Sequence, residues 1–253
     1  MIIKCTEKEK TNLMAYLNQN RVVNLFIVGD IENFGLNADF QQVLIDKDDT
    51  IHAVYLIYRD SLVICSYEKK LDLAFIEKLV LKYKTRYISG VEPIIALIDN
   101  IPYQKREDCY FAKMTKKNEM IDTSLANLAK YDQLSAIAES RKIIFNTDRS
   151  ELASLQHSFN TKTGRSYAIF NGTEAVSIAS STAECEGLAM VVGVGTLSDY
   201  RGKKYASMCI TKLSNALLDD GKTPCLFYNN PSAGRIYKAL GYEDIDRWSI
   251  LKL

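Results

Sequence analysis

The chain has 253 residues, of which 47% are hydrophobic, and its 32 Lys and Arg residues nearly balance its 31 Asp and Glu residues. This length is enough for one large domain or two small ones, each with a buried core. A net charge of +1 gives no electrostatic reason to expect a nucleic acid or an anionic membrane as partner, and neither is expected.

The cysteines and the start of the sequence indicate the class of protein. The six cysteines are scattered in mostly apolar segments, without a Cys-x-x-Cys pair or a Cys/His cluster. That distribution is typical of reduced, buried thiols and argues against a disulfide framework and against a metal site. The first residues lack the pattern of a signal peptide, and no apolar run is long enough to span a bilayer. We therefore expect a cytoplasmic protein without a metal.

The first half of the chain alternates between helical and strand patterns. Thr6 and Glu9 have the spacing of a capping box that opens a helix through about Asn18, and residues 22–34 predict a second helix that Gly35 ends. Apolar runs between short polar turns then predict an antiparallel meander, followed by helix, strand, helix and strand. The predicted strands are residues 41–45, 51–58, 62–67, 86–89 and 109–114, and the predicted helices are 71–80 and 93–99.

The second half repeats this order after a polar, unpatterned segment, residues 115–124, which is the best candidate for a linker. Asn171-Gly172 between two strand patterns is a strong hairpin signal. The predicted helices are 125–141, 149–159, 206–217 and 231–240, and the predicted strands are 166–170, 173–180, 188–197, 224–228 and 245–253. The repeat predicts an α/β (α+β) protein of two tandem units, 1–120 and 125–253. In each, helices flank a mixed, mostly antiparallel central sheet.

The most informative stretch runs from Leu188 to Leu218. Residues 188–197 are an almost continuous apolar run, which predicts a strand buried on both faces, and apolar residues then recur at helical spacing. A basic turn, residues 201–204, lies between strand and helix. It is either a solvated turn or a phosphate site, because a helix start presents free N–H groups and a positive dipole. Gly193 and Gly195 favour the site, since glycine inside a strand marks a bulge or a close approach.

A second informative stretch surrounds Asn230. This residue and Pro231 have the positions of an N-cap and a first helical residue, and Tyr237 lies on the apolar face of the helix that follows. Taken alone, the pattern indicates a capping residue and a core tyrosine. A buried tyrosine nevertheless needs a partner for its hydroxyl, and this helix follows a strand expected beside the strand at 188–197.

Together the two stretches resemble the GNAT superfamily of acyl-CoA-dependent N-acyltransferases. The family's phosphate loop, Arg/Gln-x-x-Gly-x-Gly/Ala, is matched by Arg201-Gly-Lys-Lys-Tyr-Ala206. Its second motif is matched by Asn230, Tyr237 and Leu240-Gly241-Tyr242, and the match covers about residues 165–253. The departure is Lys204, where the family usually has glycine. A side chain there either weakens the approach of a pyrophosphate or adds charge to its site.

The resemblance gives each half of the chain a role. It implies that residues 125–253 are an acetyl-CoA-binding GNAT catalytic domain. Residues 1–120 are expected to be a degenerate GNAT-like copy that does not bind CoA, because the turn at 68–71 has no glycine and no Arg-x-x-Gly-x-Ala pattern. A homodimer is left open.

The resemblance also implies roles for individual residues. The backbone of Val194, Gly195 and Thr196 is expected to pair with the pantetheine arm, and the Val194 N–H to polarise the thioester carbonyl. Asn230 is expected to contact the pantetheine, and Tyr237 to donate a proton to the departing thiolate. The residues expected to hold the pyrophosphate are Arg201, Gly202, Lys203, Lys204, Tyr205, Ala206 and Ser207.

The implied reaction transfers an acetyl group from acetyl-CoA to a primary amine of a small molecule or peptide by direct attack. Since the attacking amine must be neutral, a base is required, and Glu184 and Glu186 are the candidates. The alternative for both is a solvated pair at a hairpin turn. The alternative function is a non-catalytic acyl-CoA-binding or structural module. Asn230 and Tyr237 favour the enzyme, because a binding module has no need of a proton donor.

Overall fold

The computed structural model describes residues 1–148 and 150–253 and divides into two compact units. Unit 1 comprises Met1–Phe111 and Ile245–Leu253, and unit 2 comprises Ala112–Asp244. This division differs from the predicted domains 1–120 and 125–253 in two respects. Unit 1 ends before the polar segment 115–124, and it also includes the residues from Ile245 onward. Two strands, β7 (Lys105–Met114) and β13 (Tyr242–Lys252), therefore continue from one unit into the other.

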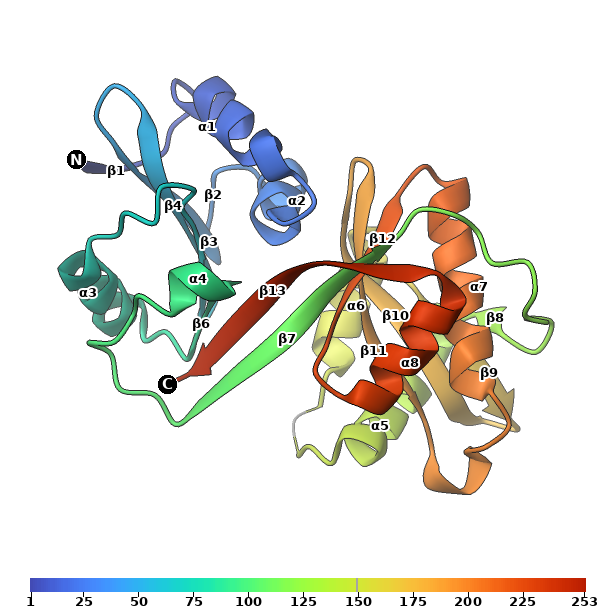
Figure 1. The fold of residues 1–253 in the computed structure, drawn as a ribbon. Coiled ribbons are helices and arrows are strands. Elements are labelled where there is room, and N and C mark those ends of the chain that lie inside the picture. Colours follow the sequence, from blue (N-terminus) through green and yellow to red (C-terminus); the bar gives the residue numbers. More distant parts are fainter. Residues whose placement is uncertain (149) are drawn as a thin grey trace. The chain divides into compact units, whose positions relative to one another are not determined.

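Unit 1 is built on the predicted meander (Figure 1). Its strands follow the order β1-β3-β4-β5-β6-β13, antiparallel throughout except for the parallel pair β5 and β6. The short strand β2 pairs with β3. The strands are β1 (Ile2–Lys4), β2 (Asn37–Ala38), β3 (Gln41–Lys47), β4 (Ile51–Tyr58), β5 (Ser61–Cys65) and β6 (Tyr87–Val91). The helices are α1 (Lys10–Leu17), α2 (Leu25–Phe34), α3 (Leu73–Tyr83) and α4 (Glu92–Ile95).

The core of unit 1 explains why β4 is apolar at almost every position. Ala53, Tyr55 and Ile57 belong to one cluster with Ile76 and Leu79 of α3. The alternate residues of the strand are also buried, and α1 contacts β4. A strand covered on both faces has no solvent side on which polar residues would be favoured.

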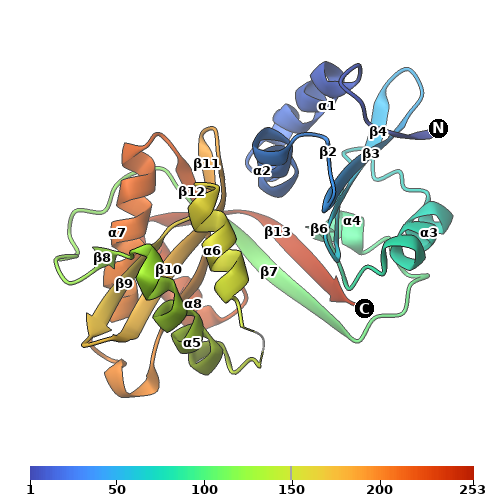
Figure 2. The same ribbon diagram turned by 180° about the vertical axis from the view of Figure 1, so that it is seen from behind.

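Unit 2 has the strand order β7-β12-β11-β10-β9-β8, in which β11 and β12 are parallel and β8 to β11 pair antiparallel. Figure 2 shows the same strands from behind. The strands are β8 (Asn127–Leu128), β9 (Ser166–Asn171), β10 (Glu174–Cys185), β11 (Leu188–Thr196) and β12 (Thr223–Tyr228). The helices are α5 (Leu134–Phe145), α6 (Leu152–Asn160), α7 (Tyr205–Asp219) and α8 (Pro231–Leu240).

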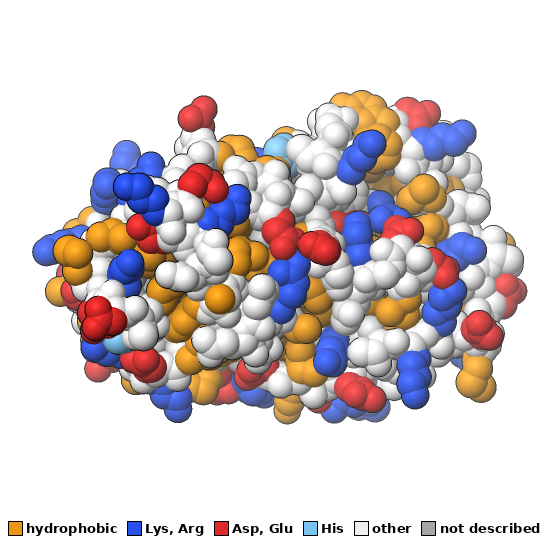
Figure 3. Space-filling model, turned by 90° about the horizontal axis from the view of Figure 1, so that it is seen from above, with side chains coloured by type: hydrophobic (Ala, Val, Ile, Leu, Met, Phe, Trp, Pro, Cys, Tyr) orange, Lys and Arg blue, Asp and Glu red, His pale blue; other side chains and the backbone are white. Residues whose placement is uncertain are grey.

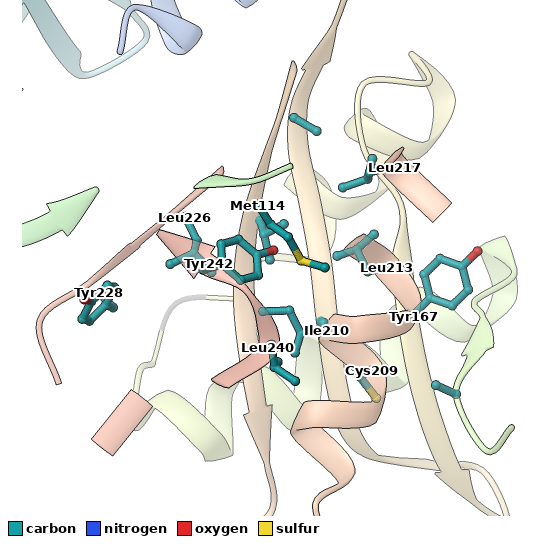
Figure 4. Packing of buried hydrophobic residues seen from close by; sticks show 14 of the residues in the cluster. Met114, Tyr167, Cys209, Ile210, Leu213, Leu217, Leu226, Tyr228, Leu240 and Tyr242 are labelled. Atoms are coloured by element: carbon teal, nitrogen blue, oxygen red, sulfur yellow. The ribbon is translucent and has the colours of Figure 1, made fainter. Parts of the chain in front are cut away.

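Helices cover both faces of the sheet in unit 2. Tyr167 and Ile169 of β9 pack in one cluster with Ile210 and Leu213 of α7, several of which are seen in Figure 4. Ala168, between them in the strand, packs instead in a cluster with residues of α5. Because successive side chains of a strand point to opposite faces, α7 and α5 lie on opposite sides of the sheet. The predicted fold class, a mostly antiparallel sheet flanked by helices, is confirmed.

Several predicted elements of unit 2 differ in extent from the observed ones. The helix predicted from residue 125 begins only with a 3₁₀ turn at Tyr131, because Asn127 and Leu128 pair with β9 instead. The strand predicted to end at residue 180 continues to Cys185. Its polar residues are tolerated in the interior because the hydroxyls of Ser166 and Ser180 are 2.8 Å apart and bond to each other. The predicted helix 149–159 is observed as α6, which begins only at Leu152, and residue 149 lies outside the described residues.

Acidic and basic side chains are mixed over the face drawn in Figure 3, in keeping with the balanced charge. Among the described residues, no helix combines the length and apolar character that a bilayer crossing requires. In the same part of the chain, no three His, Cys, Asp or Glu side chains are grouped as metal ligands. All six cysteines have free, buried thiols.

Candidate functional site

The candidate site begins with a bulge in β11. Ile178 of β10 lies opposite Gly195 and Ser180 lies opposite Val192, so β11 has one residue more than its partner over this interval. Gly193, inside the bulge, has a φ of +62°. A Cβ on Gly193 would lie 2.6 Å from Cζ of Arg141. Glycine is therefore favoured by the left-handed backbone, and the guanidinium occupies the space that a Cβ would take.

On its other edge, β11 stops pairing with β12 close to the bulge. The parallel pairing with β12 joins Leu188–Val191 to Thr223–Leu226 and ends there. Both strands nevertheless continue, β11 to Thr196 and β12 to Tyr228. An extended ligand arm can pair with a strand whose neighbour has diverged, as an added strand would. The sequence-predicted pantetheine residues lie in this part of β11.

A cavity of about 910 Å³ lies against the end of β11 and the start of α7. Every residue predicted to bind the cofactor lines it, with the exception of Lys203. These residues are Val194, Gly195, Thr196, Arg201, Gly202, Lys204, Tyr205, Ala206, Ser207 and Asn230. Apolar side chains that the sequence did not single out complete the wall, among them Ile121, Ile144 and Ile236. The cavity thus combines a basic end with an apolar wall, as a phosphate-bearing, partly apolar ligand requires.

The basic turn is arranged to leave the start of α7 open. Lys204 is the N-cap residue, and no side-chain hydrogen bond caps the helix there. The first N–H groups of a helix have no intrahelical acceptor, so this end can take an anion. Lys204 has a φ of +58°, in the left-handed region that glycine adopts without strain. The backbone thus explains why glycine is usual at this position and why Lys204 carries a conformational cost of about 1 kcal/mol.

The other basic residues of the turn have separate environments. Arg201 lines the cavity, and its Nε donates to the Thr196 carbonyl oxygen at 3.2 Å, which ties the turn to the end of β11. Lys203 instead places Nζ 5.4 Å from the ring centroid of Tyr200 and 5.9 Å from that of Tyr205. The structure therefore brings Arg201 and Lys204 to the cavity and leaves Lys203 over aromatic rings outside its lining.

Asn230 has both of the roles that its sequence context allows. Its side chain accepts a hydrogen bond from the Ser232 N–H at 2.9 Å and so caps α8, and the residue also lines the cavity. The cap fixes the side chain of Asn230 at the edge of the site. Capping and ligand contact are therefore not competing explanations.

Tyr237 lies in an aromatic cluster and is not among the lining residues of the cavity. Its ring centroid is 5.7 Å from that of Tyr228 and 6.0 Å from that of Tyr242. Burial raises the pKa of Tyr237, so its hydroxyl stays protonated at neutral pH and is able to donate a proton. The structure thus places Tyr237 on the helix that borders the cavity, within the core.

The geometry does not support Glu184 or Glu186 as the base. Glu184 is buried, its Oε2 lies 2.7 Å from both Arg165 Nη2 and Lys222 Nζ, and its Oε1 accepts a hydrogen bond from Ser181 Oγ. Burial alone raises the pKa of Glu184, but the hydrogen bonds from these partners lower it overall, which makes the carboxylate a weak base.

The position of the two glutamates is also unfavourable. Glu186 is exposed in the turn before β11, and neither residue lines the cavity. The strand rises about 3.3 Å per residue, so the start of β11 is roughly 20 Å from Gly195 at the other end. Glu184 instead holds three segments of unit 2 together, and the predicted role as base is not supported for either residue.

Sequence reasoning missed a charged pair next to the bulge. Arg141 of α5 is 9% exposed, and its Nη2 lies 2.6 Å from Oε2 of Glu151. The signal in the sequence is that Arg141 follows Leu134, Ile137 and Ala138 at helical spacing, on the face that should be apolar throughout. A charge at such a position indicates either a buried ion pair or a site.

A family model described as "GNAT acetyltransferase" matches residues 35–251. The chain belongs to the GNAT acetyltransferase family. A search of curated proteins found no match of significant similarity.

Solved structures share the fold of this GNAT chain. A GCN5-related N-acetyltransferase from Sphaerobacter thermophilus is 12% identical with a TM-score of 0.65, covering 100% of this chain and 95% of the other. A Drosophila protein is 11% identical with a TM-score of 0.67, covering 100% and 98%. A tandem GNAT protein from the clavulanic acid biosynthesis pathway is 9% identical with a TM-score of 0.61, also covering 100% and 98%. At these identities the likeness concerns the fold alone.

Proposed function

We propose that the protein transfers an acetyl group from acetyl-CoA to a primary amine of a small molecule or peptide, and that unit 2 carries the reaction. The observation that supports this most strongly is the cavity of about 910 Å³, where the end of β11, the basic turn and Asn230 meet. Proteins of the family typically use acetyl-CoA, and the residues around the cavity suit its parts. The uncapped start of α7 suits the pyrophosphate, and the diverging strand suits the pantetheine arm.

The chemistry follows from where the thioester would lie. In this proposal the Val194 N–H donates to the thioester carbonyl and stabilises the oxyanion that forms when the amine attacks. The C–S bond then breaks, and the Tyr237 hydroxyl supplies the proton that the departing thiolate needs. A side chain swing or a bridging water connects Tyr237 to the cavity, because its ring is packed between Tyr228 and Tyr242.

Binding and turnover test the proposal in two steps. Thermal unfolding with acetyl-CoA at millimolar concentration is expected to shift to higher temperature, since a ligand that binds only the native state stabilises it. An unchanged melting temperature contradicts the proposal. Thiol release from acetyl-CoA is then measured over polyamines, aminoglycosides, amino acids and peptide N-termini, and at least one class is expected to be acetylated.

The packing of Tyr237 favours a second candidate, an acyl-CoA-binding module without catalysis. In that case Tyr237 is a core residue, in accordance with its two aromatic neighbours. This candidate predicts the same thermal shift but no thiol release with any amine. The two functions are therefore separated by the second step alone.

A further inference from the structure

Arg141 is a buried cation directly behind the bulge. Its guanidinium packs against Gly193, where a Cβ would lie 2.6 Å from Cζ, and the residue is 9% exposed. Its charge is paired with Glu151, the N-cap residue of α6, at 2.6 Å. A buried charge is retained at the cost of its desolvation, so a structural or functional reason for it is expected.

The ion pair leaves part of the guanidinium without a hydrogen-bond acceptor. Glu151 contacts Nη2, whereas the Nε of Arg141 is buried and has no hydrogen-bond partner within residues 1–148 and 150–253. Nε and one terminal nitrogen form the edge that a carboxylate occupies with both oxygens when it binds arginine side-on. A ligand carboxylate that took over this edge would pair both nitrogens and release Glu151 for another partner.

A polar cavity of about 310 Å³ adjoins the pair. Arg141 and Glu151 line it together with Val192, the residue that precedes Gly193 in β11. The remaining lining residues are mostly hydroxyl-bearing: Ser154, Leu155, Ser158, Ser181 and Thr182. The cavity therefore offers a cation, an anion and several neutral hydrogen-bonding groups next to the bulge, where the thioester lies in the proposed function.

We propose that this cavity holds the acceptor, and that the acceptor is an amine that also carries a carboxylate, with the class of α-amino acids as the simplest case. The inference rests on the proposed function. Arg141 binds the carboxylate, and Glu151 binds the ammonium group. Two opposite charges held side by side complement a zwitterion, whereas a polyamine would bring a second positive charge toward Arg141.

The same arrangement supplies the base that Glu184 and Glu186 do not. Glu151 takes one proton from the bound ammonium, and the neutral amine nitrogen bonds to the thioester carbon. An ammonium group loses two protons on becoming an amide. One proton passes through Glu151 to solvent. The second balances the proton that the thiolate receives when the C–S bond breaks, so the products are an amide, a thiol and one released proton. Atoms and charge balance without a further reactant.

The first experiment needs no variant. Thiol release from acetyl-CoA by the wild-type protein is compared for α-amino acids and for the amines that differ only in lacking the carboxylate, such as ornithine against putrescine. The kcat/KM for the amino acid is expected to be about tenfold higher or more, the effect of one charge-assisted contact. Equal or better use of the decarboxylated amines overturns the inference.

The second experiment assigns the preference to Arg141. Arg141→Gln is expected to remove most of the preference by slowing acetylation of the amino acids. Arg165→Gln is the control, because Arg165 is another ion-paired arginine of unit 2, partly buried, but lies beside Glu184. Glu151→Gln is expected to lower kcat while leaving the KM for acetyl-CoA unchanged. A control variant that loses the preference as fully as Arg141→Gln contradicts the assignment.

A binding measurement separates failure of this inference from failure of the proposed function. Calorimetric titration of the CoA-loaded protein with the preferred amino acid is expected to give a heat that Arg141→Gln abolishes. Loss of the acetyl-CoA thermal shift refutes the proposed function. A retained thermal shift, without amino-acid binding and without preference, refutes this inference alone.

Discussion

The two units have closely similar orders of elements, and the cavity lined by a basic turn belongs to unit 2. In unit 1, β5 leads into α3 as β11 leads into α7 in unit 2. The cap of α3 is Asp72, whose side chain accepts from the Phe75 N–H at 2.9 Å. The cap of α7 is Lys204, without a side-chain hydrogen bond. One helix start is thus already occupied by a carboxylate, whereas the other is left open for an anion.

The strands that precede these two helices also differ in how completely they pair with their neighbours. β5 pairs with β4 in continuous register, without a bulge, and its parallel pairing with β6 runs from Ser61 to Ile64. At Gly90 of β6 a Cβ would lie 2.6 Å from the Ile64 carbonyl oxygen, so these two strands approach closely. In unit 2 the bulge and the early end of pairing open β11. The candidate ligand site of unit 2 thus lies where ordinary sheet pairing and helix capping are left incomplete.

The largest expected effect concerns catalysis, which the proposed function places in unit 2. Tyr237→Phe removes the hydroxyl and keeps the ring that packs against Tyr228. Loss of a general acid is expected to lower kcat about a hundredfold or more, with the affinity for CoA unchanged. Turnover is measured at saturating acetyl-CoA and amine. Unchanged kcat makes Tyr237 a core residue and supports the binding-module alternative.

The next prediction converts the open helix start into a capped one. Lys204→Asp places a carboxylate where unit 1 has Asp72, and replaces attraction of a pyrophosphate by repulsion. We expect acetyl-CoA to bind about thirtyfold more weakly, equivalent to about 2 kcal/mol, as measured by calorimetry. Lys204→Gly is the matched control, because it removes the charge and also the left-handed strain. If Lys204→Asp binds as tightly as the wild type, the start of α7 is not the pyrophosphate site.

The reciprocal change in unit 1 is expected to affect stability only. Asp72→Ala removes the cap of α3 and should lower the free energy of unfolding by about 1 kcal/mol. Binding of acetyl-CoA is expected to stay the same, with no second equivalent in calorimetry. A second bound CoA per chain in this variant, or in the wild type, would show that unit 1 retains a nucleotide site and would remove the contrast between the units.

The smallest expected effects concern how stability depends on pH, and they have opposite signs in the two units. In unit 1, hydrogen bonds from His52 to Asp48 and then to Glu68 raise the pKa of the imidazole. The contribution of His52 to the free energy of unfolding is complete below the unfolded pKa of about 6.5 and is lost as the pH rises through the raised folded pKa. In unit 2, the lowered pKa of Glu184 gives a contribution that is present above its unfolded value of 4.5 and is lost as the pH falls through the folded value.

Urea unfolding between pH 2 and pH 9 measures both effects, because the Glu184 contribution is lost only below pH 4.5. His52→Gln is expected to flatten the alkaline side of the profile, and Glu184→Gln the acidic side. Glu184→Gln is also expected to lower stability at neutral pH, because Arg165 and Lys222 lose their shared partner. A profile that His52→Gln leaves unchanged on the alkaline side would exclude the imidazole as the source of that slope.

The sequence was sufficient where a signal is local. β4 and α8 have the predicted bounds, 51–58 and 231–240, because one is a continuous apolar run and the other lies between an N-cap and a glycine. The candidate cofactor residues from Val194 to Ser207 were proposed for the same reason, since strand, loop and helix are consecutive there in the chain. That the residues other than Lys203 line one cavity is a finding of the structure, whereas their binding remains a prediction.

Features that depend on contacts between segments far apart in the sequence were missed, or their residues were assigned to the wrong place. The pairing of Arg141 with Glu151 joins two helices, and only the unusual position of Arg141 on an apolar face could have indicated it. Glu184 was assigned to the site because it precedes the central strand. A residue before a strand lies at that strand's start, however, and the cavity lies at its end, so proximity in sequence was misleading.

The crossing of β13 from unit 2 back to unit 1 bears on the order in which the chain can fold during synthesis. Trp248 to Lys252 pair with β6, residues 87–91, so one edge of β6 has no strand to pair with until residues 245–252 have been made. All of unit 2 lies between these segments and is complete at Asp244. We therefore expect unit 2, which is synthesised second, to complete its fold first. Unit 1 is expected to complete its sheet last, when the strand that follows unit 2 in the sequence pairs with β6.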